Sequence, residues 1–264
     1  MRPKSRIIIA GLLAIVAAAG CIRNSVGSDG RESSFRVTRV TDGDTIELSN
    51  GRKVRYIGID TPETRKRRGR DWVYSPEPYS QAAKDHNEAL LRQGNVTLEF
   101  DEQKEDKYGR FLAYVYAGDR MVNEDLLREG YATLFIYPPN TKYLELMIGA
   151  QEDARRNERG MWKTLKTISP GEAGAYIGKL CTVKGKVLRC GRLGEVIFLN
   201  FGEKHKNGFT ALIYNNNVQF FEKQGISSPE NYYNGRQVAL TGKIRDRNGP
   251  QIVVYHPSQI EDQK

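Results

Sequence analysis

Short segments rich in β-branched residues, separated by turn signals, constrain the fold of this chain more than any other feature. Three of them lie near the start, at 35–41 (FRVTRVT), 45–49 (TIELS) and 53–59 (KVRYIGI). The last two flank Asn50-Gly51, the strongest short signal for a hairpin. Two further strand patterns lie at 96–100 and 110–117, and helical spacing occurs at 78–93, 123–129 and 141–157. This order predicts a mainly β fold with helices, in which five short strands close into a small barrel.

A second strand pattern follows the break at Ser169-Pro170-Gly171. Its strand candidates are 179–188, 195–201, 209–214, 236–244 and 251–255, with a helix candidate at 217–223. Three strands, a helix and two strands are the order of an OB-fold barrel. We therefore expect an OB-fold-like five-stranded barrel domain at 35–165, followed by a second OB-fold-like β-barrel domain at 170–262.

The first 21 residues have the pattern of an export signal. Three basic residues precede an uncharged apolar run at 7–19, which is shorter than the roughly 20 residues of a membrane span. The AAGC ending resembles the cleavage box of bacterial lipoproteins, in which the cysteine, here Cys21, becomes the lipidated first residue. We expect a signal peptide at 1–21, a flexible tether at 22–34, and an exported lipoprotein of the cell envelope held to a membrane by its lipid anchor. A secreted or periplasmic protein is the alternative.

The remaining cysteines and the net charge bear on the second strand pattern. Cys181 and Cys190 are an even pair in an exported chain, but on one strand they would lie roughly 30 Å apart, so we expect no disulfide.

The chain carries a net charge of +9, and residues 166–264 hold 14 Lys and Arg against 8 Asp and Glu. That balance suits a polyanionic partner or an anionic membrane surface.

Two acidic turns lie close together in the first strand pattern. In TDGDT at 41–45, Asp42 and Asp44 are two residues apart, so their side chains share a face of an extended backbone. A two-residue turn at Asn50-Gly51 would set Asp44 opposite Ile57, with Arg55 diagonally across from Asp44. Asp60 would emerge at the same end of the hairpin, so that three carboxylates and a guanidinium converge.

Carboxylate oxygens of this kind suit calcium or magnesium rather than zinc or copper. An arginine beside them fits a phosphate oxygen bridged between the cation and the guanidinium. Mutual neutralisation of Arg55 and the acids is the structural alternative.

Three motifs in order, VTDGDT, RYIGIDTPET and DKYGRFLAYVY, resemble the staphylococcal nuclease (thermonuclease) family across roughly residues 35–163. The resemblance implies that Asp44, Asp60 and the backbone carbonyl of Thr61 bind Ca²⁺, with Asp42 as an outer-shell acid. It implies that Arg55 and Arg110 hold the scissile phosphate and that Glu63 orients or deprotonates the attacking water. Lys107 and Tyr108 would border the nucleotide, together with Tyr137; Phe135 stands where the family has a further tyrosine.

The resemblance implies a calcium-dependent endonuclease that hydrolyses DNA and RNA, single strands preferred, to products with 3′-phosphate ends. Its partners would be nucleic acid and the membrane, with no protein partner evident. A non-catalytic exported nucleic-acid-binding protein is the alternative. For residues 170–262 we expect nucleic-acid binding, with protein docking or envelope anchoring as the rival. The basic run at 65–70 (RKRRGR) is expected to be a loop beside the site that either guides the substrate backbone or is merely solvated.

Overall fold

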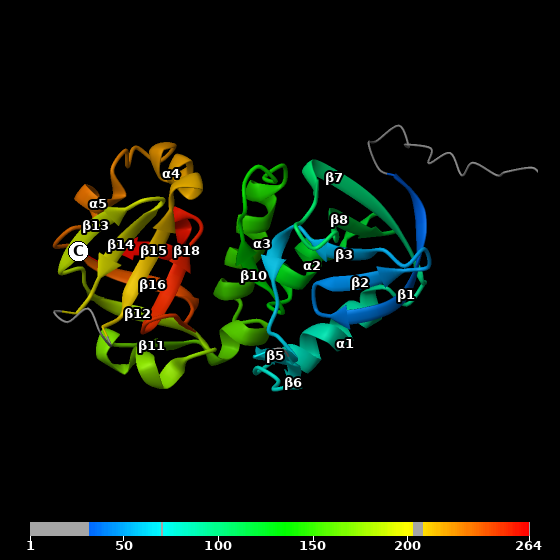
Figure 1. The fold of residues 1–264 in the computed structure, drawn as a ribbon, viewed down its shortest axis with the longest axis horizontal. Coiled ribbons are helices and arrows are strands. Elements are labelled where there is room, and N and C mark those ends of the chain that lie inside the picture. Colours follow the sequence, from blue (N-terminus) through cyan, green and yellow to red (C-terminus); the bar gives the residue numbers. More distant parts are fainter. Residues whose placement is uncertain (1–31, 70, 203–207, 264) are drawn as a thin grey trace, which may run out of the picture.

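The computed structural model describes residues 32–69, 71–202 and 208–263 (Figure 1). The predicted signal peptide, Cys21 and most of the predicted tether lie outside the described residues. Strand β1 begins at Glu32, inside the segment expected to be a tether. In the part of the chain that is described, no helix combines the length and the apolar character needed to cross a membrane.

The first barrel closes as the strand pattern predicts. Its strands are β1 (Glu32–Asp42), β2 (Thr45–Leu48), β3 (Lys53–Tyr56), β7 (Asn95–Glu105) and β8 (Phe111–Ala117). They pair in the order β3-β2-β1-β7-β8, and β8 pairs with β3 in parallel to complete the five-stranded ring. Ile46, Val54, Leu98 and Val115 are buried in its core. The predicted mainly β fold with an OB-fold barrel is confirmed.

Helices and short strands surround this barrel (Figure 1). They are α1 (Ser80–Leu90), α2 (Val122–Arg128), α3 (Leu144–Arg156), the 3-10 helix η1 (Gly160–Thr164), β4 (Gly58–Asp60), β9 (Arg120–Met121) and β10 (Thr133–Phe135). Asn123, in the first turn of α2, is buried: it accepts a hydrogen bond from Val115 N–H and donates one to Ile57 O, which ties the helix to the barrel. The basic run expected to be a loop forms a hairpin of β5 (Arg65–Arg68) and β6 (Asp71–Tyr74) instead.

The second strand pattern folds around its own core, which includes Val183, Leu199, Ile213 and Val254. Its strands are β11 (Lys166–Ile168), β12 (Leu180–Lys186), β13 (Arg189–Leu193), β14 (Val196–Asn200), β15 (Thr210–Tyr214), β16 (Gln237–Lys243), β17 (Arg245–Asp246), β18 (Pro250–Val254) and β19 (Ile260–Asp262). Its helices are η2 (Pro170–Tyr176), α4 (Asn215–Glu222), α5 (Pro229–Tyr232) and η3 (Pro257–Gln259).

These strands pair in two sheets, in an order that resembles that of an OB-fold barrel. β12 pairs with β16, and β13, which follows β12 in the chain, pairs with β14. β14 pairs in turn with β15, and β15 runs parallel to β18. β17, which directly follows β16, pairs with β18 and so links the two sheets. Among the described cysteines, Cys181 and Cys190 are both free, as expected.

Direct contacts join the two barrels, which lie side by side in Figure 1. Arg155 of α3 forms an ion pair with Glu261 of β19. Asn217 of α4 donates hydrogen bonds to Tyr255 O (2.8 Å) and, across the junction, to Ile136 O (3.4 Å). The second barrel is therefore fixed against the edge of the first that carries β4 and β10.

Candidate active site

The hairpin of β2 and β3 holds Arg55 in a register that differs from the expected one by one residue. The expected register set Asp44 opposite Ile57, but Thr45 pairs with Arg55, which sets Asp44 beside Tyr56. The turn is one residue longer than expected, because Leu48 N–H donates to Arg52 O and the intervening residues are 49–51. Gly51 there has a φ of 78°, the left-handed conformation that a three-residue hairpin loop needs. Asp44 lies just before β2, where Tyr56 N–H donates to its carbonyl oxygen.

The guanidinium of Arg55 lies between two carboxylates. Its Nη1 is 2.7 Å from Asp44 Oδ2, and its Nη2 is 3.1 Å from Asp60 Oδ1. Burial alone would lower the pKa of Arg55, but the nearby acids raise it above its ordinary value. Burial raises the pKa of Asp44 to about 6, against the opposing effect of Arg55. The predicted convergence of Asp44, Arg55 and Asp60 is thus present in the structure.

The two acidic turns are packed directly against each other. Thr61 donates from both its backbone N–H and its Oγ1 to Asp44 Oδ2, at 2.8 and 3.0 Å. A Cβ at Gly43 would lie 2.7 Å from Thr61 Oγ1, so only glycine allows this approach. Asp42 Oδ1 accepts the N–H of Asp44 at 3.2 Å.

Glu63 follows on a loop that is fastened by Glu77. The N–H of Glu63 donates to Glu77 Oε2 (3.1 Å), and the N–H of Glu77 donates to Glu63 O (2.9 Å). Glu77 is buried and forms an ion pair with Lys243 of β16, in the second barrel. Withdrawal of the Glu63 carboxyl from water raises its pKa above the ordinary value, Asp44 and Asp60 add to the rise, and Arg55 and Lys243 oppose it. A carboxylate with a raised pKa is a better proton acceptor at neutral pH.

Arg110 is held by the tight turn between β7 and β8. Asp106 accepts the N–H of Tyr108 (2.9 Å), the N–H of Arg110 (3.0 Å) and the Nε of Arg110 (2.7 Å). Gly109 supplies a φ of 76° in this turn. The role of Asp106 was not predicted, although an acid four residues before a functional arginine in a turn motif is a signal for it.

Six predicted catalytic and substrate-binding residues line one hollow in the surface, which we call the catalytic hollow. They are Arg55, Glu63, Lys107, Tyr108, Arg110 and Tyr137. Phe135 lines it too, and its ring lies 6.0 Å from the guanidinium carbon of Arg55. Tyr108 and Tyr137 expose 73% and 59% of their surface, which leaves their rings open to a ligand.

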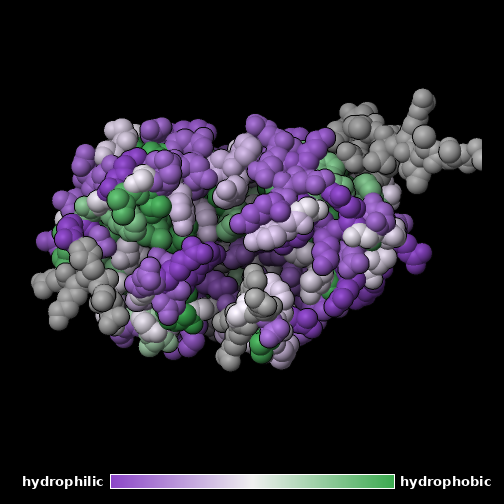
Figure 2. Space-filling model, in the orientation of Figure 1, coloured by the Kyte–Doolittle hydropathy of each residue, from purple (hydrophilic) through white to green (hydrophobic). Residues whose placement is uncertain are grey.

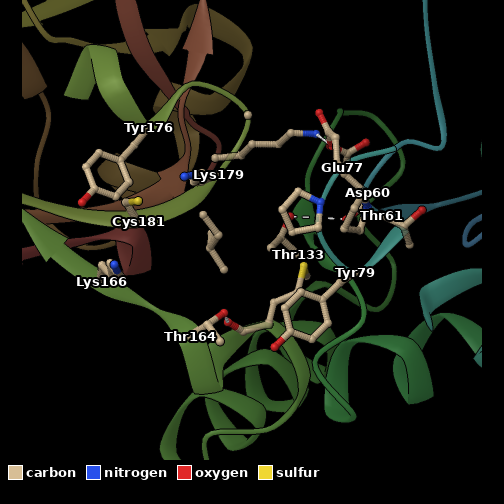
Figure 3. A pocket seen from close by; sticks show the side chains of 16 residues that line it. Asp60, Thr61, Glu77, Tyr79, Thr133, Thr164, Lys166, Tyr176, Lys179 and Cys181 are labelled. Carbon is tan, nitrogen blue, oxygen red and sulfur yellow. Dashed lines mark hydrogen bonds and ion pairs between the residues drawn. The ribbon is translucent and has the colours of Figure 1, made fainter. Parts of the chain in front are cut away.

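The predicted metal ligands do not line the catalytic hollow. Asp44 is buried and pairs with Arg55. Asp60 and Thr61 line a separate cavity between the barrels (Figure 3). The opposite wall of that cavity includes Tyr176, Lys179 and Cys181. No group of three or more His, Cys, Asp or Glu side chains in the described part of the chain is arranged to hold a metal ion. The donors are of the type that calcium prefers, because they are carboxylate and carbonyl oxygens, and the Asp44 and Asp60 carboxylates both approach the Arg55 guanidinium.

The second barrel also reaches the site. Arg245 Nη2 of β17 lies 3.5 Å from Asp60 Oδ2, on the side away from Arg55. Glu77, Lys243 and Arg245 were not predicted to be part of the site. Lys243 and Glu77 are 166 residues apart, so no local pattern connects them.

Comparisons with known proteins find relatives of the first barrel. The model of the family described as staphylococcal nuclease homologue matches residues 53–164. A thermonuclease of Staphylococcus intermedius is 42% identical over 140 residues, which cover 52% of this chain and 80% of that protein. A thermonuclease of Staphylococcus hyicus is 38% identical over 170 residues, which cover 59% of this chain and 97% of that protein. The chain belongs to the staphylococcal nuclease family.

The endonuclease YncB of Bacillus subtilis is 41% identical over 129 residues, which cover 47% of this chain and 59% of that protein. Membership confirms the prediction that the protein is a nuclease, a hydrolase of phosphodiester bonds. The family model ends at residue 164, so the second barrel lies outside that match.

Proposed function

We propose that the protein is a calcium-dependent endonuclease that hydrolyses DNA and RNA and leaves 3′-phosphate ends. The observation that carries the proposal is the catalytic hollow, where two arginines and one glutamate face the same space beside the Asp44–Arg55–Asp60 cluster. An anionic phosphodiester repels a nucleophile, so its hydrolysis needs positive charge on the phosphate and a positioned water. The chain supplies both.

Arg55 and Arg110 bind the non-bridging oxygens of the scissile phosphate and neutralise the charge that develops there. They are preorganised, because Asp44 and Asp60 hold one guanidinium and Asp106 holds the other. Glu63 accepts a hydrogen bond from the attacking water and orients it in line with the 5′ oxygen that leaves. Asp44, Asp60 and the Thr61 carbonyl would hold the calcium ion, and a divalent cation adds further charge stabilisation.

The test is digestion of single-stranded DNA and RNA by the chain lacking residues 1–21, with calcium and with a chelator. We expect cleavage with calcium, loss of cleavage with the chelator, and new ends that phosphatase converts to 3′-hydroxyls. Cleavage that persists in the chelator, or ends that phosphatase does not alter, would contradict the proposed chemistry. Tight binding with no cleavage under any metal would favour the alternative of a non-catalytic nucleic-acid-binding protein.

We also propose that the protein is exported and anchored to a membrane through a lipid on Cys21. The proposal is supported by the basic start, the apolar run and the AAGC ending of residues 1–21. Wild-type protein expressed in a bacterium is expected to enter the detergent phase, and a Cys21→Ser variant the aqueous phase. Equal partitioning of the two would leave secretion as the better account.

A further inference from the structure

One face of the second barrel carries a row of large side chains outside its core. Successive side chains of a strand point to opposite faces, and Ile197, Leu199 and Ile213 point inward because they are buried. Phe198 of β14 therefore lies on the outer face, where it pairs with Leu212 of β15. Figure 2 shows a hydrophobic patch over β14 and β15 on this face.

Two adjoining hollows connect this face to the catalytic hollow. The first, on the outer face, is lined by Phe198, Tyr214 and Arg247 among others. The second lies at the junction of the barrels and shares Tyr214 with the first. It shares Phe135 and Tyr137 with the catalytic hollow. We call this continuous path the aromatic track.

The junction of the track is built from both barrels. The ring of Phe135, from β10, lies 4.9 Å from the ring of Tyr255, which follows β18. Asn217 holds the backbone at Tyr255 and at Ile136 by hydrogen bonds. Arg245 lines the same hollow while it pairs with Asp60. A ligand in the catalytic hollow could therefore continue onto the second barrel without leaving the protein surface.

Side chains along the track fit one chemical class of ligand. Aromatic rings stack on unpaired bases regardless of sequence, and arginines beside them meet the phosphates. Arg245 and Arg247 flank the rings, and the acid at this edge, Glu195, accepts a hydrogen bond from Asn215. A duplex keeps its bases paired and so cannot offer their faces to the rings. The occupant that fits is a single strand.

We propose that the aromatic track binds the part of a single-stranded nucleic acid that extends beyond the cleaved bond, so that the second barrel lengthens the substrate site of the first. The proposal rests on the proposed function. It is tested on the full chain with Phe198→Ala and Tyr214→Ala, neither of which touches the catalytic hollow. Leu193→Ala, at a side chain of β13 that is 76% exposed and outside the track, is the matched control.

The measurement is the Kd of labelled single-stranded DNA in a chelator, so that binding is separated from cleavage. Oligonucleotides of about 4 and about 16 nucleotides span the range of site sizes of OB folds. Each ring substitution is expected to weaken binding of the long strand by at least about five-fold, the lower end for one lost stack. The short strand and the Leu193→Ala control are expected to be unchanged.

Two results would overturn the track. Unchanged affinity of both ring variants for the long strand would leave this face as a protein-docking surface. An equal loss for both lengths would place the effect at the catalytic hollow. Cleavage of the short strand with calcium is measured in parallel and tests the proposed function. The binding assay contains no available metal and tests the track, so failure of one proposal is distinguishable from failure of the other.

Discussion

At the residue scale, Arg55 and Arg110 differ in how much of the fold depends on them. The side chain of Arg55 is 14% exposed and pairs with two carboxylates, whereas that of Arg110 is 32% exposed and pairs with Asp106 on the same turn. Removing one partner of a buried ion pair costs about 3–5 kcal/mol, because the other charge is left uncompensated. Truncation of Arg55 would therefore lower stability and catalysis together, and Arg110 gives the cleaner test.

Arg110→Ala is expected to reduce kcat by about 100-fold or more, the usual cost of removing a group that stabilises transition-state charge. The melting temperature is expected to change little, since the lost ion pair lies in a surface turn. Initial rates and thermal unfolding measure the two effects. Arg120→Ala, which removes an exposed arginine paired with Asp125, is the control. A kcat equal to that of the control would reassign the phosphate site.

Gly43→Ala tests the packing of the two acidic turns. A methyl group there meets Thr61 at 2.7–2.8 Å, so we expect both a lower melting temperature and slower cleavage, because Asp44 is displaced from Arg55. Gly149→Ala is the matched control: it lies in α3 with no atom within 4 Å of the new methyl, and alanine favours the helix by roughly 0.5–1 kcal/mol. Wild-type stability and rate for Gly43→Ala would show that the turns can move apart.

At the element scale, the strand patterns predicted the two barrels because each strand buries alternate side chains or a continuous apolar run. The hairpin of β2 and β3 was predicted with the wrong register, since Asn50-Gly51 specifies a turn but not whether Ser49 belongs to it. The sequence pattern showed only that Asn123 begins a helical segment, whereas in the structure its side chain satisfies backbone groups of β8 and of Ile57. Bonds of that kind depend on tertiary packing, and no local spacing reveals them.

A lysine of β16, in the second barrel, contacts the loop that bears Glu63. Lys243 pairs with Glu77, which accepts a hydrogen bond from the N–H of Glu63. Lys243→Met removes the ion pair between Lys243 and the buried Glu77, so we expect the loop bearing Glu63 to loosen and kcat to fall by about ten-fold, with a smaller change in KM. Lys184→Met, on the neighbouring β12, is the control for loss of one lysine.

The double variant Lys243→Met/Glu77→Gln completes a mutant cycle for this ion pair. A neutral amide at Glu77 removes the charge with which Lys243 pairs, so we expect the two substitutions to be non-additive by about 0.5–3 kcal/mol in the free energy of unfolding. Chemical denaturation of the four proteins measures it. Strict additivity would contradict a coupling between the second barrel and the loop.

At the scale of the whole molecule, the sequence indicated two barrels but not how they meet. The three catalytic motifs could be located because they occur within a single domain in the order that is typical of the family. The contacts of Lys243, Arg245 and Asn217 with the first barrel join segments far apart in the chain and have no sequence signal of their own. The structure therefore adds to the site a second wall, where Arg245 contacts Asp60 and Tyr255 contacts Phe135.

Removal of residues 169–264 is expected to weaken binding to single strands and to flatten its dependence on salt, because the removed part carries an excess of basic residues. The logarithm of the binding constant against the logarithm of salt concentration gives the slope for each protein. An identical slope for the full and shortened chains would assign the second barrel to protein docking or envelope anchoring.

The proposed function requires that Glu63 works with Arg55 and Arg110 on one phosphodiester bond. Glu63→Gln keeps the size of the side chain and removes its ability to accept a proton, so the single-turnover cleavage rate tests the claim most directly. We expect that rate to fall by about 100-fold or more with calcium, while the Kd for a short single strand in chelator stays unchanged. A wild-type cleavage rate in this variant would contradict the account.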